Sequence, residues 1–257
     1  MASSPLWRLL PLKRGKPAEN MAIDETILEA RRHNLVPNTL RFYQWQPSTA
    51  SIGRNQSIKD EIDVEFAKKN NIAVIRRISG GGAVFHDTQG ELTYSIVIGD
   101  IPRINAEETY NYLSSGIQRG LSKLGLKVTF DKIHCPSLFV QGRKISGNAQ
   151  ARRGNTLLQH GTILINYNPE LMYKVLRVPP GKTQKGIIRS VFQHVTTISR
   201  ELEIKATIKT VYQAMVEGFT ETLERNLIEG TLIEWEQQKI QELLMNKYNS
   251  DKWIFKK

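Results

Sequence analysis

The sequence of 257 residues contains a single cysteine, Cys135, so it cannot form an internal disulfide. Disulfides belong mainly to oxidising compartments, and their exclusion favours a reducing one. No apolar run approaches the roughly 20 residues that a membrane-spanning helix needs. Near the N-terminus, charges and prolines follow a short apolar patch too closely for a secretory signal. We therefore predict a cytoplasmic protein without a membrane span.

Long basic runs are also absent, although the formal net charge is +11. The 36 lysines and arginines are scattered, and none of the recognisable nucleic-acid-binding modules is present. This pattern fits a solvated basic surface or an acidic protein partner better than DNA or RNA. The five histidines lack the spacing typical of metal ligands, so we expect no metal site built from protein groups.

The composition is otherwise that of an ordinary globular protein, 40% hydrophobic and 24% charged. The glycines do not follow the G-x-G-x-x-G pattern of a Rossmann fold, and helical and strand-like segments alternate without a regular βαβ rhythm. We predict an α+β (mixed α/β) fold, a mixed β-sheet flanked by helices. Apolar spacing predicts helices at 17–35, 60–70, 105–124, 169–176, 207–225 and 234–248, and strands at 40–45, 50–53, 72–75, 92–98, 127–130, 138–145 (a hairpin turning at Gln141-Gly142) and 156–165.

Three adjacent glycines, Gly80 to Gly82, stand between two predicted strands and directly follow Arg76, Arg77, Ile78 and Ser79. Such a run loses much backbone entropy on folding, and is expected where the backbone takes a positive φ or lets a ligand approach. Guanidinium groups bind phosphate or carboxylate through paired hydrogen bonds, so the stretch fits an anion-binding loop. A glycine-rich hairpin with solvated arginines is the alternative, because glycine patterns alone are weak motifs.

A second candidate lies in the predicted hairpin, where Lys144 precedes Gly147 in GRKISGNAQ. A lysine flanked by apolar residues can face a pocket and stabilise negative charge there. The glycine beside it would let a ligand reach the backbone. An isolated lysine in a hairpin more often faces solvent, so these residues taken alone leave both alternatives open.

The motifs together are more specific than each one alone. RRISGGGAVFHD, GRKISGNAQARR and LQHGTIL, in this order, resemble the lipoate–protein ligase A family and its octanoyltransferase relatives, which are more distantly related to the biotin protein ligases. This resemblance implies one catalytic domain over 1–257, with a mixed sheet and surrounding helices. Further matches extend over nearly the whole chain, at Asn20–Glu25, Leu40–Trp45, Ser51–Gln56 and Lys247–Trp253.

The ligases of this family bind lipoate and ATP with Mg²⁺ and form lipoyl-AMP. They pass the lipoyl group to a lysine of a lipoyl domain, of the 2-oxoacid dehydrogenase E2 or glycine cleavage H protein type. The resemblance implies that Lys144 is catalytic and that the loop 178–188 closes over the adenylate. It implies ATP or lipoyl-adenylate binding by Arg77, Ser79, Gly80, Gly81, Gly82, Ala83, Val84, Phe85, His86, Lys144, Gly147 and Ala149, and an acyl pocket formed by Arg54, His160, Gly161 and Thr162.

Two departures from the ligase pattern concern the acyl donor. Longer ligases carry a small C-terminal domain that is absent here, so we expect a separate accessory protein to supply it. One branch of relatives instead uses a cysteine as an acyl-accepting nucleophile and needs no ATP. Cys135 matches that branch, although it is closer to Lys144 than the branch suggests. Because GGGAVFHD resembles the ATP-using ligases, we predict a lipoate–protein ligase, with an octanoyl or lipoyl transferase using Cys135 as the alternative.

Overall fold

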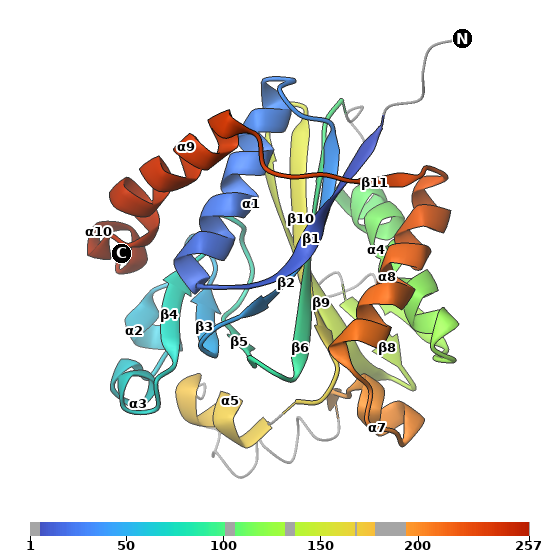
Figure 1. Cartoon of the computed structure of the whole chain (residues 1–257). Helices are drawn as coiled ribbons and strands as arrows, with labels where there is room; N and C mark the ends of the chain where they lie inside the picture. The colour runs from blue at the N-terminus through green and yellow to red at the C-terminus, as the bar shows by residue number, and fades with distance from the viewer. Residues whose placement is uncertain (1–5, 101–105, 132–136, 168, 178–193, 257) are drawn as a thin grey trace.

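A mixed eight-stranded β-sheet forms the centre of the computed structural model (Figure 1). The structure describes residues 6–100, 106–131, 137–167, 169–177 and 194–256. The strand order is β11-β1-β2-β6-β10-β9-β8-β7; β1 runs parallel to both neighbours, and the other neighbouring pairs are antiparallel. The strands are β1 (Trp7–Gly15), β2 (Asn38–Trp45), β6 (Glu91–Ile98), β7 (Val128–Asp131), β8 (Ser137–Val140), β9 (Arg143–Arg153), β10 (Thr156–Leu164) and β11 (Leu227–Glu229).

Helices cover both faces of this sheet, which confirms the predicted fold class. Strand β2 is buried along its whole length, and its successive side chains enter opposite cores, as a strand's period of two requires. Phe42 packs in the core beneath α4 (Ala106–Lys123) and α8 (Ile208–Leu223), whereas Tyr43 and Trp45 pack toward α1 (Pro17–Arg32) and α9 (Glu234–Leu243). Figure 1 shows α4 and α8 on one side of the sheet and α1 and α9 on the other. None of the helices in these described ranges is long and apolar enough to cross a membrane.

A smaller, three-stranded sheet with the order β4-β3-β5 lies beside the N-terminal start of α1 and carries the glycine loop. It has its own apolar core, which includes Ile52 and Phe85 and is covered by short helices. The elements of this unit are β3 (Thr49–Ile52), α2 (Ile58–Glu61), α3 (Val64–Lys69), β4 (Ala73–Arg76), β5 (Val84–His86) and α5 (Pro169–Val175).

The C-terminal segment returns to the smaller sheet and to α1. It continues α9 through a π-helix, η1 (Leu244–Tyr248), into α10 (Asp251–Ile254). The π-helix directs Lys247 and Tyr248 to the same buried carboxylate, Glu25 on α1, at 2.7 and 2.6 Å. Burial raises the pKa of Glu25, but the Lys247 ammonium and these hydrogen bonds together lower it by more, so the net shift is downward. The segment is thus held by charge as well as by apolar packing.

Most of the predicted elements are present, and the differences have local causes. The single helix predicted at 60–70 is wrong: Ile62 is extended and bridges to Leu176, and Asp63 caps a new helix by accepting from the Phe66 amide at 2.9 Å. The predicted turn at Gln141-Gly142 is confirmed, with φ of 49° and 74°. The sequence patterns did not reveal β1, β5, β11, α7 (Ile198–Leu202) or α10.

Candidate active site

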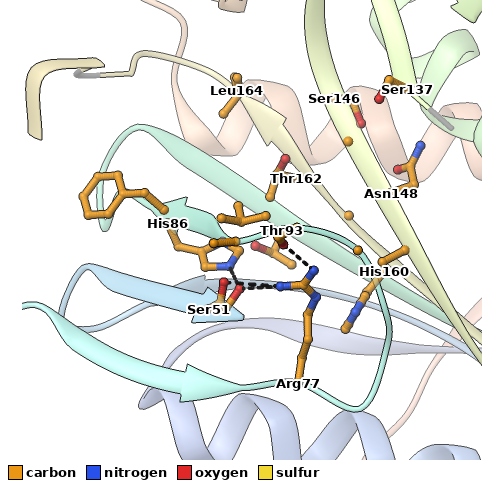
Figure 2. Close-up of a pocket in the computed structure, with 18 of the residues that line it drawn as sticks. Ser51, Arg77, His86, Thr93, Ser137, Ser146, Asn148, His160, Thr162 and Leu164 are labelled. Carbon is orange, nitrogen blue, oxygen red and sulfur yellow. Dashed lines mark hydrogen bonds between the residues drawn. The ribbon is translucent and has the colours of Figure 1, made fainter. Parts of the chain in front are cut away.

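A pocket of about 370 Å³ lies between the two sheets. Its floor is one face of the larger sheet, where cross-strand pairing aligns side chains from four strands: Tyr43 opposite Thr93, Thr93 opposite Thr162, and Thr162 opposite Gly147. Its roof is the smaller sheet with the glycine loop, from which Ser51, Arg77 and Gly81 to His86 line the cavity. Figure 2 shows the Arg77 side chain between Ser51 and His160, with Thr162 above them.

Lys144 reaches this pocket because of a β-bulge. In the β8–β9 ladder, Leu138 pairs with Ser146 and Phe139 pairs with Lys144, so Ile145 is an extra residue on β9. Without the bulge, Lys144 and Gly147, three residues apart, would point to opposite faces of the sheet. With it, Nζ of Lys144 lies 2.9 Å from where a Cβ on Gly147 would be. Gly147 thus leaves room for the lysine amine against the pocket floor.

The glycine loop needs its glycines for two different reasons. Gly81 has a φ of +89°, which a residue with a side chain rarely adopts. Gly53, at the end of β3, lets the loop pass over it: a Cβ there would lie 2.2 Å from the carbonyl oxygen of Gly81. The amide of Arg54 donates to the carbonyl of Ser79 at 2.8 Å and fixes the start of the loop. The loop therefore packs on the backbone of β3, while Gly80, Gly81 and Gly82 themselves remain exposed.

The two arginines before the glycines make different contacts. Arg77 lines the pocket and Arg76 does not, which corrects the expectation that both bind an anion. Arg76 is buried and donates to the backbone carbonyls of Trp253, Ile254 and Lys256 in the C-terminal segment. Arg77 points to the pocket, as the alternation of side chains at the end of β4 requires. Burial lowers the pKa of Arg77 to about 10, so it remains a cation at neutral pH.

Two buried histidines border the pocket, and each contacts a serine and a carboxylate. His160 lies 2.6 Å from Oγ of Ser79 and 3.1 Å from Oδ2 of Asp24, and Asp24 also pairs with Arg41 at 2.8 Å. Burial raises the pKa of Asp24, but Arg41 and His160 outweigh this, so the net shift is downward and the carboxylate stays ionised.. These groups come from α1, β2, β10 and the glycine loop, so the pocket wall depends on segments far apart in the sequence.

The second histidine is His86 on β5. Its ring lies 2.8 Å from Oγ of Ser51 and 2.6 Å from Oε1 of Glu91, and it stacks on Trp45 with ring centroids 4.2 Å apart. The indole of Trp45 donates to Thr93 at 2.8 Å. In the described residues no group of three His, Cys, Asp or Glu side chains has the geometry of a metal site.

Most residues implied by the sequence motifs lie together in this pocket. Ser79 and Gly80 are not among the lining residues, and Arg54 is exposed and also outside the lining, although predicted for the acyl pocket. Cys135 and the predicted lid at 178–188 lie outside the described residues. The predicted residues that line the cavity are Arg77, Gly81, Gly82, Ala83, Val84, Phe85, His86, Lys144, Gly147, Ala149, His160, Gly161 and Thr162.

The sequence patterns missed several lining residues with apolar side chains. Some belong to segments that were quoted only as supporting matches: Met21 follows Asn20, and Tyr43 and Trp45 lie in LRFYQW. Alternation within β2 could have placed Tyr43 and Trp45 on one face. Other missed residues lack such a signal, because tertiary packing alone brings them to the site; they are Leu164, Tyr167, Met172 and Val195.

Comparison with known proteins agrees with this geometry. A family model for the lipoyl protein ligase A/B catalytic domain matches residues 16–220. The chain is 35% identical to the octanoyltransferase LipM of Kyrpidia tusciae, over 98% of this chain and 99% of that protein, and 32% identical to LipM of Bacillus subtilis, over 98% of each. The solved bipartite lipoate protein ligase of Thermoplasma acidophilum has a TM-score of 0.88 at 29% identity, covering 98% of this chain and 97% of the other. A lipoate–protein ligase A solved with ATP has a TM-score of 0.86 at 27% identity, covering 97% and 98%.

These comparisons correct the predicted activity. The curated relatives that match the chain from end to end are octanoyltransferases, so the prediction of an ATP-dependent lipoate ligase is wrong and its stated alternative fits better. The physical reason is that the glycine loop, Lys144 and the LQHG segment form the walls of a pocket, and the residues of a pocket wall do not specify which donor brings the substrate. The matched family model and the full-length relatives show that this chain belongs to the lipoyl protein ligase A/B catalytic-domain family.

Proposed function

We propose that this protein transfers an octanoyl group from the thioester of an acyl carrier protein to a lysine of a lipoyl-domain protein, through an acyl thioester on Cys135. The observation that carries this proposal is the similarity to octanoyltransferases over 98% of the chain. The acceptor is of the 2-oxoacid dehydrogenase E2 or glycine cleavage H protein type. The +11 charge would favour an acidic acceptor or carrier. The reaction needs neither ATP nor Mg²⁺, nor the accessory protein that a ligase would need.

The pocket has the character that an acyl chain requires. Its volume of about 370 Å³ lies within the usual range for small-molecule sites. Apolar side chains such as Leu164 and Met172 supply much of the lining, and the cations that line it are Lys144 and Arg77. We assign the acyl chain to the apolar part of the pocket, against Thr162 and Gly161, and the reacting carbonyl to the end near Lys144.

The proposed chemistry has two steps that restore the enzyme. The Cys135 thiolate attacks the carbonyl carbon of the carrier thioester, the carbon–sulfur bond to the carrier breaks, and the carrier leaves as a thiol after gaining a proton. The neutral amine of the acceptor lysine then attacks the enzyme thioester, the carbon–sulfur bond to Cys135 breaks, the amine nitrogen releases a proton to solvent to give an amide, and Cys135 leaves as a thiolate. A thioester is reactive enough for this exchange, so no separate activation of the acyl group is needed.

In this proposal Lys144 supplies a fixed positive charge. An ammonium group stabilises the thiolate before attack and the oxyanion that forms on the acyl carbonyl. In the sequence, Cys135 precedes Ser137, a residue that lines the pocket, by two positions. Ser137 also pairs with Gly147, the residue against which the Lys144 amine rests.

The test is to incubate the protein with octanoyl-acyl carrier protein and a lipoyl domain, without ATP, and follow both proteins by intact mass. We expect an octanoyl adduct on the enzyme and then on the acceptor. Because Cys135 is the only cysteine, a thioester adduct has one possible position, and Cys135→Ser should abolish it. Lys144→Ala should lower kcat by about 10²–10³-fold, whereas Lys127→Ala, at an exposed lysine before β7, should leave it unchanged. Octanoylation or lipoylation that occurs only with the free acid and ATP would refute the proposal.

A further inference from the structure

Arg77 uses all of its hydrogen-bond donors within the protein. A guanidinium group has five N–H bonds. In Arg77, Nε donates to Oγ of Ser79 at 3.2 Å, and Nη1 donates to the carbonyl and Oγ of Ser51 at 3.3 and 3.2 Å. Nη2 donates to the carbonyls of Gly80 and Gly82 at 2.8 and 2.7 Å. No N–H of Arg77 is left for a ligand, even though the side chain lines the pocket.

The two glycine carbonyls that Arg77 binds flank Gly81, the glycine of the loop with the positive φ. A loop of three glycines has many conformations of similar energy, so a fixed shape needs an external constraint. One side chain that binds the carbonyl before and the carbonyl after the left-handed residue supplies that constraint. Figure 2 shows the Arg77 side chain extending from β4 toward Ser51 beneath this part of the pocket.

Each serine that Arg77 binds is the start of a buried chain of hydrogen bonds. Ser51 leads to His86 and then Glu91, with contacts of 2.8 and 2.6 Å. On the other side, Ser79 leads to His160 and then to Asp24, with contacts of 2.6 and 3.1 Å. All six side chains are buried. Arg77 therefore stands where two serine–histidine–carboxylate chains meet.

The direction of the protons in both chains follows from the arginine at one end and the carboxylate at the other. A guanidinium can only donate and a carboxylate can only accept, so each serine oxygen accepts from Arg77 and each histidine donates from Nδ1, and a neutral ring then accepts the serine hydrogen at Nε2. Each histidine then carries its hydrogen on Nδ1, which donates to the carboxylate. The carboxylates thus fix the histidine rings, the rings fix the serine hydroxyls, and the hydroxyls fix the plane of the guanidinium.

We propose that Arg77 is a positioning residue, which holds the loop 79–82 in the shape that forms the pocket roof and is itself oriented by the Ser51–His86–Glu91 and Ser79–His160–Asp24 chains. It acts on the acyl substrate through the loop and makes no hydrogen bond to it. Only the kinetic arm of the test below rests on the proposed acyl transfer, because the conformation of the loop can be followed without substrate.

The first measurement is hydrogen–deuterium exchange of the peptide that covers the glycine loop, in the protein without ligand. Arg77→Lys keeps the charge but has only three donors on a single nitrogen, so it cannot bind both glycine carbonyls and both serines. We expect exchange of the amides that hydrogen-bond at the base of the loop, from residue 54 to Ser79 and from residue 77 to Ile52, to rise about tenfold or more. Ser79→Ala, which removes one chain and leaves the arginine, should produce a smaller rise. Arg225→Lys, at an exposed arginine beyond α8, should leave loop exchange unchanged.

The second measurement separates positioning from direct substrate binding. Arg77→Ala should lose most of its kcat/KM in octanoyl transfer, and added methylguanidinium, which can occupy the vacated site, should restore part of the activity together with the low exchange of the loop. Unchanged loop exchange in Arg77→Lys would overturn the proposal, whether or not turnover falls. If the wild-type protein shows no octanoyl transfer at all, the proposed function fails, while the exchange data still decide the role of Arg77.

Discussion

Substitution of Gly53 by alanine tests whether the packing of the glycine loop on β3 sets the active site. An alanine Cβ would lie 2.2 Å from the carbonyl oxygen of Gly81, whereas ordinary contact begins at 3.4 Å. The opposing atom is backbone, so no side-chain rotation can relieve the clash, and the loop must move by about 1.2 Å. Displacements near 1 Å at a reacting centre cost about 100-fold in rate. We expect kcat/KM to fall by about that factor, which corresponds to about 2.8 kcal/mol.

The stability of the same variant should change much less than its activity. Overpacking lowers the free energy of unfolding by about 1–3 kcal/mol. The smaller conformational entropy of the unfolded alanine variant offsets about 0.4–1 kcal/mol of this loss. We expect a loss of about 1–2 kcal/mol, or about 5 °C in Tm for a domain of this size. Gly80→Ala is the matched control, because a Cβ there meets no atom within 4 Å and its φ is not left-handed. Wild-type kcat/KM in Gly53→Ala would show that the loop position does not control catalysis.

Three further substitutions separate activity from stability elsewhere. Gly147→Ala places a Cβ 2.9 Å from Nζ of Lys144, so the flexible amine should move. We expect kcat to fall at least tenfold while Tm stays nearly unchanged. A large fall in Tm together with the fall in kcat would contradict this. Asp24→Asn leaves buried Arg41 without its anion and should cost about 3–5 kcal/mol in urea denaturation. Because the pKa of Asp24 is lowered in the folded state, the difference in free energy of unfolding between wild type and Asp24→Asn should be complete above about pH 5 and shrink below about pH 4. A difference that does not depend on pH would contradict this. Gly218→Ala, on α8, places a Cβ 2.4 Å from a backbone oxygen of α4. It should lower the free energy of unfolding by about 1–3 kcal/mol, while the folded fraction keeps its kcat. A Tm equal to that of the wild type would refute the close packing of α4 and α8.

The local elements followed from the sequence because their causes are local. The turn at Gln141-Gly142 takes two positive φ values between short strands, and α4 ends where Gly125 takes a φ of +92°. The N-terminal strand β1 was missed because its neighbours, β2 and β11, are remote in the sequence, and because a bulge between Leu10 and Lys13 interrupts its alternation. Strand pairing of this kind leaves little signal in a local window.

The matching motifs also showed which residues belong together before their contacts were known. Asn20 and Asp24, in the early motif, bind Arg41 from LRFYQW, and Glu25 of the same motif binds Lys247 and Tyr248 near the C-terminus. Part of each supporting segment is therefore structural. The motifs did not distinguish these contacts from substrate contacts, because burial and hydrogen-bond partners are properties of the folded chain.

The sequence by itself determined the mixed α/β fold, the family and many of the residues that line the pocket. Only the tertiary structure decided how those residues are used. A bulge at Ile145 turns Lys144 toward the pocket, and alternation at the end of β4 sends Arg76 to the C-terminal segment and Arg77 to the glycine loop. The reason is that a side chain's direction depends on strand register, and register is fixed by partners far away along the chain. The glycine loop begins as a permissive backbone and becomes a defined surface when Arg77 and Gly53 constrain it.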